Sequence, residues 1–295
     1  ILAVKVTTDD NIAKTDYVSG ILTPVFEKIK KDELDIDYIV LIRGVPIRLD
    51  NDGGFSLDSY LAVEAFDGGK ETASLSQLVN PYFKKAEPFD SKKYHYYLCT
   101  RLDGYTVDDT LNLIKNSLHA KANDGPFLLD AAPGRTGGGY GQTQNDLIAG
   151  AKILKAKKMT VKLDEGEPFV GGKGLAGYAS WGSNDAKFDM VTYNSLTFLP
   201  GAIGETYVST SGRTFRHTSG GQSLIADLIH QGITGIKGYV SEPYTVALAH
   251  VDVLFDRYTK GYNLAESFYM ASPLLKWKDV VIGDPLCSPY PKVSN

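Results

Sequence analysis

The sequence predicts an α/β protein, organised as a three-layer α/β/α sandwich around a mainly parallel sheet. Short apolar runs rich in β-branched residues alternate with longer segments of helical period, which is typical of parallel strands joined by helices. Clusters of Gly, Pro, Asn and Asp separate these runs and mark the turns between them. We expect a single domain over residues 1–295, with a mainly parallel sheet of about six strands.

The composition is that of a globular protein and excludes two kinds of interaction. Hydrophobic residues make up 43% of the 295 residues and charged residues 22%, both within the normal range. The net charge is −4 and Lys and Arg form no block, so nucleic-acid binding has no electrostatic basis. No apolar run reaches the roughly 18 residues of a membrane-spanning helix. We therefore expect no nucleic acid and no transmembrane segment.

The first half of the chain is ordered at both ends and irregular in the middle. Residues 36–43 are nearly all apolar, as in a strand buried on both faces, and Gly44 follows as a stop signal. Frequent turn residues predict an irregular excursion at about 50–92. Thr106 is a good helix cap. The predicted elements are strand 1–7, helix 12–31 with a break or restart at Thr23-Pro24, strand 36–43, strand 94–101 and helix 106–121.

The second half repeats the alternation of strands and helices. The Gly-rich segment 134–141 lacks the spacing of a dinucleotide-binding turn, so we interpret it as a surface loop. The predicted elements are strand 126–131, helix 144–157, strands 159–163, 174–180 and 202–209, helix 223–231, strand 233–240, helices 249–259 and 264–271, and an apolar run at 280–282.

Two polar clusters, 180–185 and 209–213, follow the ends of two successive strands. In an open parallel sheet, ligands bind beyond the carboxyl ends of the strands, so both clusters are expected to line one cleft. Arg213 is the predicted anchor, paired with a ligand anion or, without ligand, with Asp185 or Glu242. Loop capping and structural ion pairs are the alternative explanation. The candidate ligand-binding residues are Ser180, Trp181, Ser183, Asn184, Asp185, Arg213, Arg101 and Asp103.

The residues that could carry catalysis at these strand ends are few. Ser180 lies in a segment that misses the serine-hydrolase elbow G-x-S-x-G by its first Gly. No histidine or cysteine has metal-ligand spacing, so we expect no metal and no cofactor. Cys99 and Cys287 are predicted to be free and buried, with a mutual disulfide as the alternative. The candidates for a nucleophile and its base are Ser209, Ser211, Asp185, His217 and Glu242.

Several segments resemble an uncharacterised bacterial family found largely in genomes that carry exosortase sorting systems. The resemblance covers about residues 36–290 and implies no activity. Export or attachment to the cell surface is the expectation that goes with it, together with a chain that begins at Ile1 as if trimmed or processed. A cytoplasmic location stays open. The resembling segments are 39–48, 100–104, 198–203, 242–244 and 283–286.

The order of motifs is more distantly similar to the gingipain branch of caspase-like cysteine peptidases. In that branch one strand ends in Gly-His-Gly, the next ends in the nucleophilic Cys, and Gly-Asp-Pro closes the domain. Here Gly177-Tyr178-Ala179-Ser180 and Val208-Ser209-Thr210-Ser211 stand in the first two places, and Gly283-Asp284-Pro285 stands in the third. Since a thiolate–imidazole pair makes that chemistry work, the resemblance implies the fold without the peptidase activity.

These observations lead to one preferred function and two alternatives. We expect a non-peptidase member of this fold that binds a small molecule or a protein partner at the strand-end cleft. The first alternative is a hydrolase that uses Ser209 or Ser211 as its nucleophile. The second is a structural subunit of a homo-oligomeric or extracellular assembly, in which the 18 tyrosines face neighbouring copies.

Overall fold

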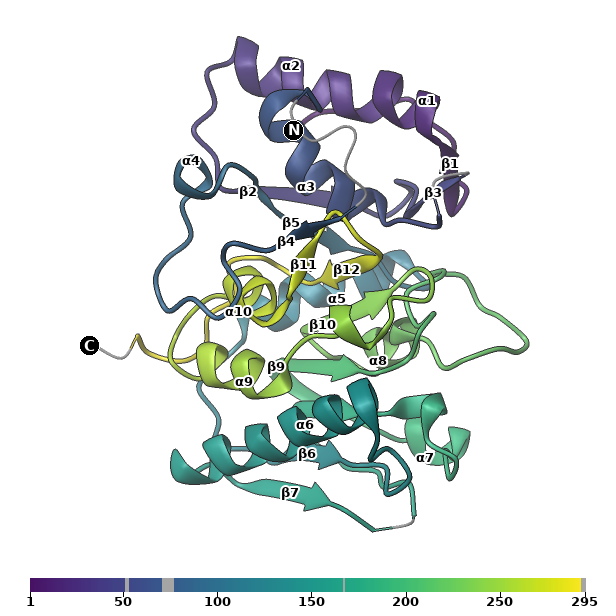
Figure 1. Cartoon of the computed structure of the whole chain (residues 1–295), viewed down its shortest axis with the longest axis vertical. Helices are drawn as coiled ribbons and strands as arrows, with labels where there is room; N and C mark the ends of the chain where they lie inside the picture. Colours follow the sequence, from purple (N-terminus) through teal and green to yellow (C-terminus); the bar gives the residue numbers. More distant parts are fainter. Residues whose placement is uncertain (51–52, 71–76, 167, 293–295) are drawn as a thin grey trace.

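The computed structural model describes residues 1–50, 53–70, 77–166 and 168–292 (Figure 1). It confirms the α/β/α fold, with a central sheet of eight strands where about six were expected. In spatial order the strands are β2 (Tyr38–Ile42), β5 (Leu98–Leu102), β12 (Asp279–Ile282), β10 (Gly235–Tyr239), β9 (Phe198–Thr206), β8 (Leu175–Ser180), β6 (Phe127–Asp130) and β7 (Val161–Asp164).

The sheet is mainly parallel, as predicted. β2 is parallel to β5, and each of β10, β9, β8, β6 and β7 is parallel to its neighbour in that series. The exception is the pair of β12 and β10: β12 is parallel to β5 but antiparallel to β10, with Ile282 opposite Ile236. β8 and β9 lie side by side, with Ser180 opposite Thr206. The loops that follow these two strands therefore leave the sheet at the same edge.

Helices cover both faces of the sheet, and strand residues alternate between them. On β6, Phe127 and Leu129 pack against α6, α9 and α10, whereas Leu128 joins a core formed with α5, α7 and α8. The helices are α1 (Lys14–Tyr17), a π-helix (Val18–Leu22), α2 (Thr23–Lys31), α3 (Leu57–Asp67), α4 (Ser91–Tyr94), α5 (Val107–Leu118), α6 (Gly138–Ala156), α7 (Met190–Asn194), α8 (Ile225–His230), α9 (Val251–Tyr258) and α10 (Leu264–Ala271).

Short strands also pair outside the main sheet. The small pairs are β1 (Asn11–Ala13) with β3 (Arg48–Asp50), and β4 (Leu78–Val79) with β11 (Leu274–Leu275). Thr106 caps α5 in a capping box with Asp109. Cys99 and Cys287 are free and buried, as predicted. No helix in the described part of the chain is long and apolar enough to cross a bilayer.

The N-terminal region differs from the prediction in three ways. Residues 1–7, predicted as a strand, form no regular element. The predicted helix 12–31 begins only at Lys14, after β1, although its restart at Thr23-Pro24 is confirmed. The π-helix ends at Leu22 and α2 begins at Thr23, with Pro24 in its first turn, where a missing N–H is tolerated. β2 is not buried on both faces: it is an edge strand, with Val40 40% and Ile42 59% exposed. Apolar composition alone does not distinguish a central strand from an edge strand.

The predicted irregular excursion at 50–92 contains a buried helix. Residues 57–65 of α3 are all buried, because the helix packs between β5 and α2. A helix that is buried on all sides lacks the one-sided pattern of apolar residues that sequence reading relies on, and α3 also buries Asp58 and Glu64 in ion pairs. Within the segment, 51–52 and 71–76 lie outside the described residues. Figure 1 shows α1, α2 and α3 beside β2, at the end of the sheet far from β7.

The Gly-rich segment also differs from its prediction. α6 begins at Gly138, six residues before the predicted start at 144, so the glycines form its first turn. The segment was interpreted as a surface loop because glycine is a poor helix former. The segment follows the end of β6 directly.

Candidate functional site

The two predicted polar clusters do meet at one edge of the sheet. The Asn184 amide, after β8, donates to the carbonyl oxygen of Tyr207, after β9, at 2.6 Å. Gln222 joins both loops, since its amide donates to Asn184 Oδ1 at 2.9 Å and its Oε1 accepts from Thr210 at 2.7 Å. Ser183 Oγ accepts the backbone N–H of Ser223 at 2.9 Å. The clusters therefore form one hydrogen-bonded platform.

Several predicted ligand-binding groups are used up inside this platform. Ser180 is fully buried, and its hydroxyl donates to the Tyr178 hydroxyl at 2.7 Å. Arg213 pairs with neither Asp185 nor Glu242, the partners predicted for it. It donates instead to the carbonyls of its own loop, those of Thr210, Gln222 and Gly220, at 2.8–3.1 Å. These contacts make it a clamp for the loop.

A cleft of about 410 Å³ opens beside the platform, at the low end of the volumes of small-molecule sites. Its walls come from the loops after four neighbouring strands, β6, β8, β9 and β10. The lining residues are Arg135, Gly139, Tyr140, Trp181, Asn184, Tyr207, Ser209, Glu242, Pro243, Tyr244, Thr245 and Leu248. We call it the strand-end cleft. Trp181, Asn184, Ser209 and Glu242 are predicted site residues that line it; Arg135 was not predicted.

Arg135 is the central charge of the strand-end cleft. Its guanidinium lies 4.9 Å from the ring centroid of Tyr140 and 5.1 Å from that of Trp181, so it is held between two aromatic side chains. It donates a hydrogen bond to the carbonyl of Asn184. Among the described residues, no carboxylate lies within ion-pair distance of it. Trp181 is held in turn by its indole N–H, which donates to Gln144 at 2.6 Å.

The first turn of α6 adds a second positive feature to the same wall. Its N-cap, Gly137, offers no side-chain cap, and the first turn holds no acidic residue. Gly139 and Tyr140 of this turn line the cleft. The first N–H groups of a helix have no intrahelical partner and carry the positive end of its dipole. This wall of the strand-end cleft is therefore suited to a negatively charged group.

The predicted catalytic residues do not form a nucleophile–base pair in the described structure. Ser209 lines the cleft, but no described base hydrogen-bonds to it. Ser211 is fully buried. His217 stacks on Tyr105 at 4.0 Å, in a different pocket. Asp185 is 8% exposed and accepts the N–H of Lys187 at 2.8 Å. Of the five predicted catalytic residues, Ser209 and Glu242 are the two that line the strand-end cleft.

The two cysteines are also unsuited to nucleophilic attack. Burial raises the pKa of Cys99 well above its ordinary value, and burial likewise raises that of Cys287. A thiol in such surroundings stays protonated at neutral pH, whereas the reactive form is the thiolate.

Two buried carboxyl groups near the strand ends were missed by sequence reasoning. Burial raises the pKa of Glu205, on β9, to about 8, although Lys237 and the hydroxyl of Tyr239, which donates to it at 2.8 Å, favour the charged form. Burial also raises the pKa of Asp130, on β6, to about 7. The signal available in the sequence was a single acidic residue inside each apolar strand.

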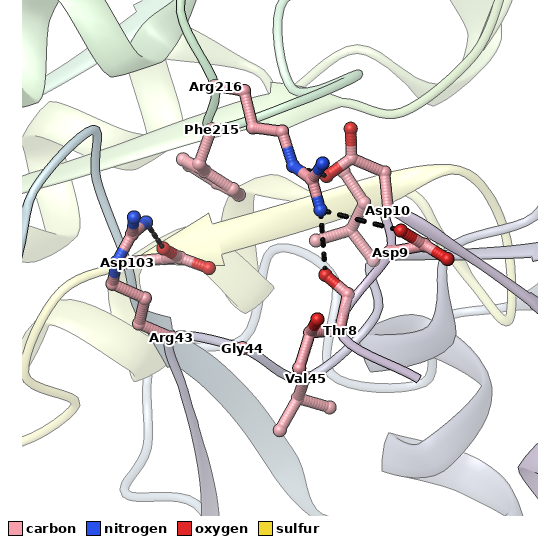
Figure 2. A pocket seen from close by; sticks show the side chains of 10 residues that line it. Thr8, Asp9, Asp10, Arg43, Gly44, Val45, Asp103, Phe215 and Arg216 are labelled. Carbon is pink, nitrogen blue, oxygen red and sulfur yellow. Dashed lines mark hydrogen bonds and ion pairs between the residues drawn. The ribbon is translucent and has the colours of Figure 1, made fainter. Parts of the chain in front are cut away.

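A second pocket, of about 390 Å³, lies at the ends of β2 and β5 (Figure 2). Arg43 and Asp103 form one ion pair at 3.2 Å, and Arg43 also donates to the carbonyl of Gly104 at 2.6 Å. On the opposite side, Arg216 lies 3.6 Å from Asp9 and 3.8 Å from Asp10. We call it the paired pocket. Both of its arginines have carboxylate partners.

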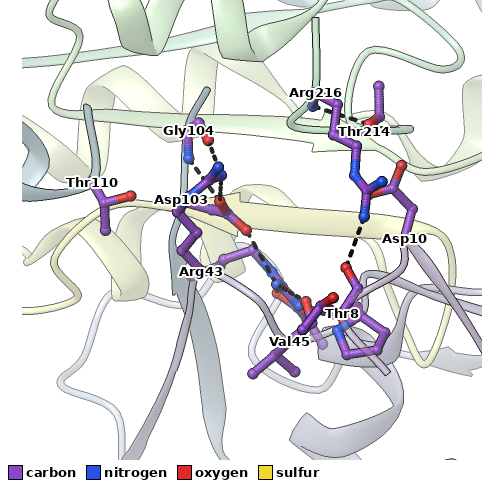
Figure 3. Close-up of polar contacts among 12 residues, drawn as sticks. Thr8, Asp10, Arg43, Val45, Asp103, Gly104, Thr110, Thr214 and Arg216 are labelled. Carbon is purple, nitrogen blue, oxygen red and sulfur yellow. Dashed lines mark hydrogen bonds and ion pairs between the residues drawn. The ribbon is translucent and has the colours of Figure 1, made fainter. Parts of the chain in front are cut away.

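Arg101 and Asp103, predicted for the same cleft as Trp181, belong to the paired pocket and its base. Arg101 is fully buried and donates to both oxygens of Asp58, at 2.6 and 3.0 Å, as well as to the carbonyls of Val45 and Pro46. Figure 3 shows Arg43 with its two partners, the carboxylate of Asp103 and the carbonyl of Gly104. The predicted single site is thus divided between two pockets.

Comparison with known proteins gives a fold and no family. No protein-family model matches the chain, and no curated protein is similar to it. One solved structure, described as "Structure of Protease", is similar over 93% of this chain and 70% of its own, with a TM-score of 0.54 and 11% identical residues. At that identity the likeness concerns the fold alone. The protein therefore has a protease-like fold.

Proposed function

We propose that this protein is a non-peptidase member of a protease-like fold, and that it binds a ligand with an anionic group in the strand-end cleft. The observation that carries the proposal is Arg135, a cation positioned by Tyr140 and Trp181 without a described carboxylate partner. A partly buried charge without a counter-ion is costly, and a ligand anion would offset that cost. A carboxylate or phosphate matches the planar guanidinium best.

The rest of the strand-end cleft supports binding of a polar ligand larger than a single ion. The first turn of α6 offers uncapped N–H groups next to Arg135. Ser209 supplies a hydroxyl, and Tyr244, 60% exposed, supplies an aromatic surface. A carboxylate-bearing small molecule or the C-terminus of a peptide has this combination of charge and polarity.

The alternatives have less support. A hydrolase would need a base for Ser209, and no described side chain hydrogen-bonds to its hydroxyl. An assembly held together by tyrosines would need these side chains at the surface. Most of the tyrosines lie in the core, including Tyr17, Tyr60, Tyr82, Tyr96, Tyr178, Tyr193, Tyr207, Tyr239 and Tyr258. Export, and any link to exosortase systems, stay predictions based on the family resemblance.

The experiment uses the fluorescence of Trp181, which contacts Arg135. Inorganic phosphate, acetate and a short peptide with a free C-terminal carboxylate are titrated, with the C-terminally amidated peptide as the neutral partner. We expect saturable quenching by at least one anionic probe. Arg135→Ala should weaken it by roughly tenfold or more, equal to about 1.4 kcal/mol. Arg216→Ala is the matched control, because it removes an arginine from the paired pocket. Equal affinity in Arg135→Ala and the native protein would refute the proposal.

A further inference from the structure

A cluster of three metal-ligating side chains lies outside the strand-end cleft. Asp146 belongs to α6, His250 is the N-cap residue of α9, and Asp252 lies in the first turn of α9. One ligand atom from each lies within 4.8 Å of the other two. Two carboxylates and an imidazole from two packed helices are thus brought to one point.

Two atoms of this cluster are buried without a hydrogen-bond partner. Asp252 Oδ1 and His250 Nδ1 are both inaccessible to solvent and accept or donate no hydrogen bond to a described residue. Nδ1 does lie 3.0 Å from Asp146 Oδ2, but not in hydrogen-bonding geometry. Buried polar atoms are nearly always paired in folded proteins, so atoms left unpaired at one point indicate a missing partner.

A third unpaired group is the hydroxyl of Tyr207, the residue that follows β9. Tyr207 is 1% exposed, and its hydroxyl has no hydrogen-bond partner among the described residues. It belongs to the same buried cluster as Ala249 and Val251, which flank His250, and Leu147, which follows Asp146. A buried tyrosine hydroxyl normally finds a partner. Tyr207 is therefore an independent sign that this point of the fold lacks a positively charged or polar group.

The charges at this point are unbalanced in the direction that favours a cation. Two carboxylates, those of Asp146 and Asp252, meet a single imidazole, that of His250, with ligand atoms within 4.8 Å of one another. Two carboxylates so close together repel each other. A divalent cation would neutralise both carboxylates.

We propose that Asp146, His250 and Asp252 bind a divalent transition-metal ion, with Zn²⁺ or Mn²⁺ as the matching class. An imidazole nitrogen with two carboxylate oxygens suits these ions, whereas Mg²⁺ and Ca²⁺ prefer oxygen ligands alone. Supporting contacts hold the ligands in place. Gln142 donates to Asp146 Oδ1 at 2.9 Å, and the ring of Phe83 meets that of His250 edge-on at 4.9 Å. The ion would join α6 to α9.

The test is metal binding by tag-free protein that has been treated with a chelator and then desalted. The heat of binding is measured by isothermal titration calorimetry, and the melting temperature by thermal unfolding, with Zn²⁺, Mn²⁺, Mg²⁺ and Ca²⁺ in turn. We expect Zn²⁺ or Mn²⁺ to bind with one ion per chain and to raise the melting temperature, and Mg²⁺ and Ca²⁺ to have much smaller effects. Asp252→Asn and His250→Ala should each weaken binding by roughly tenfold or more.

Asp108→Asn is the matched control, because Asp108 is an exposed acidic residue in the first turn of α5 and should leave metal binding unchanged. Asp252→Asn also separates a metal site from a plain His250–Asp146 ion pair. Without metal this variant should melt no lower than the native protein, since it removes a repelled carboxylate. Equal binding by native, Asp252→Asn and His250→Ala proteins, or no binding of either metal to the native chain, would overturn the proposal.

Discussion

The strand-end cleft and the paired pocket are nearly equal in volume, about 410 and 390 Å³, and each contains arginine. They differ in what the arginines contact. In the paired pocket, Arg43 and Arg216 meet carboxylates of the chain itself. In the strand-end cleft, Arg135 meets aromatic rings and a carbonyl. The comparison teaches that the partners of the arginines, more than the volume, distinguish a structural pocket from a candidate binding site.

The segments that form the two pockets illustrate this difference. The paired pocket lies where residues 8–10 meet the loops after β2, β5 and β9. Its ion pairs hold these segments together, because Arg43 joins the loops after β2 and β5, and Arg216 joins the loop after β9 to Asp9 and Asp10. In the strand-end cleft, Arg135 links the loops after β6 and β8 through the carbonyl of Asn184, and it forms no ion pair with a described residue.

The largest expected effect comes from the base of the paired pocket. Asp58→Ala leaves the fully buried guanidinium of Arg101 without its carboxylate. We expect a loss of about 3–5 kcal/mol in the free energy of unfolding, as is usual when one partner of a buried ion pair is removed. Chemical denaturation measures it. Arg216→Ala, which breaks an exposed pair, should cost at most about 1 kcal/mol. Similar losses in both variants would contradict a structural role for the buried pair.

The next effect is a pH dependence of stability that originates beneath the strand-end cleft. Glu205 has a pKa of about 8 in the folded protein, against 4.5 as its ordinary value. Between those values the folded protein keeps a proton that the unfolded chain has lost, so stability should fall as the pH rises from about 5 to 8 and then level off. The expected change is a few kcal/mol.

Glu205→Gln should flatten this part of the pH profile, because the amide keeps the neutral state of the side chain. Urea unfolding at several pH values measures the slope in both proteins. Asp130, with a pKa of about 7, contributes a loss of stability of the same sign over a narrower pH range, and this smaller total loss should remain in the variant. An unchanged slope in Glu205→Gln would show that another group controls the dependence.

The smallest effect tests the loop clamp. Arg213→Ala removes the hydrogen bonds to three carbonyls of the loop after β9, and we expect a loss of about 1–2 kcal/mol and faster proteolysis between residues 210 and 222. Anion binding through Arg135 should persist within a few fold. If Arg213→Ala abolished binding while the loop stayed resistant to protease, the anchor would be Arg213, as the sequence predicted.

Part of this site could be predicted because it depends on local pattern and on strand direction. Alternating apolar and helical segments predict a parallel sheet, and parallel neighbours end at the same edge. That reasoning was enough to place the clusters at 180–185 and 209–213 together. It also located Trp181, Asn184, Ser209 and Glu242, which line the strand-end cleft.

Other features could not be predicted, because they depend on which side chains meet across the fold. Arg135 lies in a Gly-rich segment that has no helical pattern, and only its contact with Trp181 identifies it. Asp146 and His250 come from helices far apart in sequence, so their spacing carries no metal signal.

The sequence by itself determined the α/β/α architecture, the edge of the sheet where polar groups gather, and the absence of a Cys–His pair at that edge. These properties follow from periodicity and residue type, which are local. Only the tertiary structure decided that Arg101 is neutralised by Asp58 and that Arg213 is bound by three carbonyls of its own loop. It likewise decided that Arg135 lies between two aromatic rings, with no described carboxylate beside it. The reason is physical: the function of a charge depends on its partners, and long-range packing selects those partners.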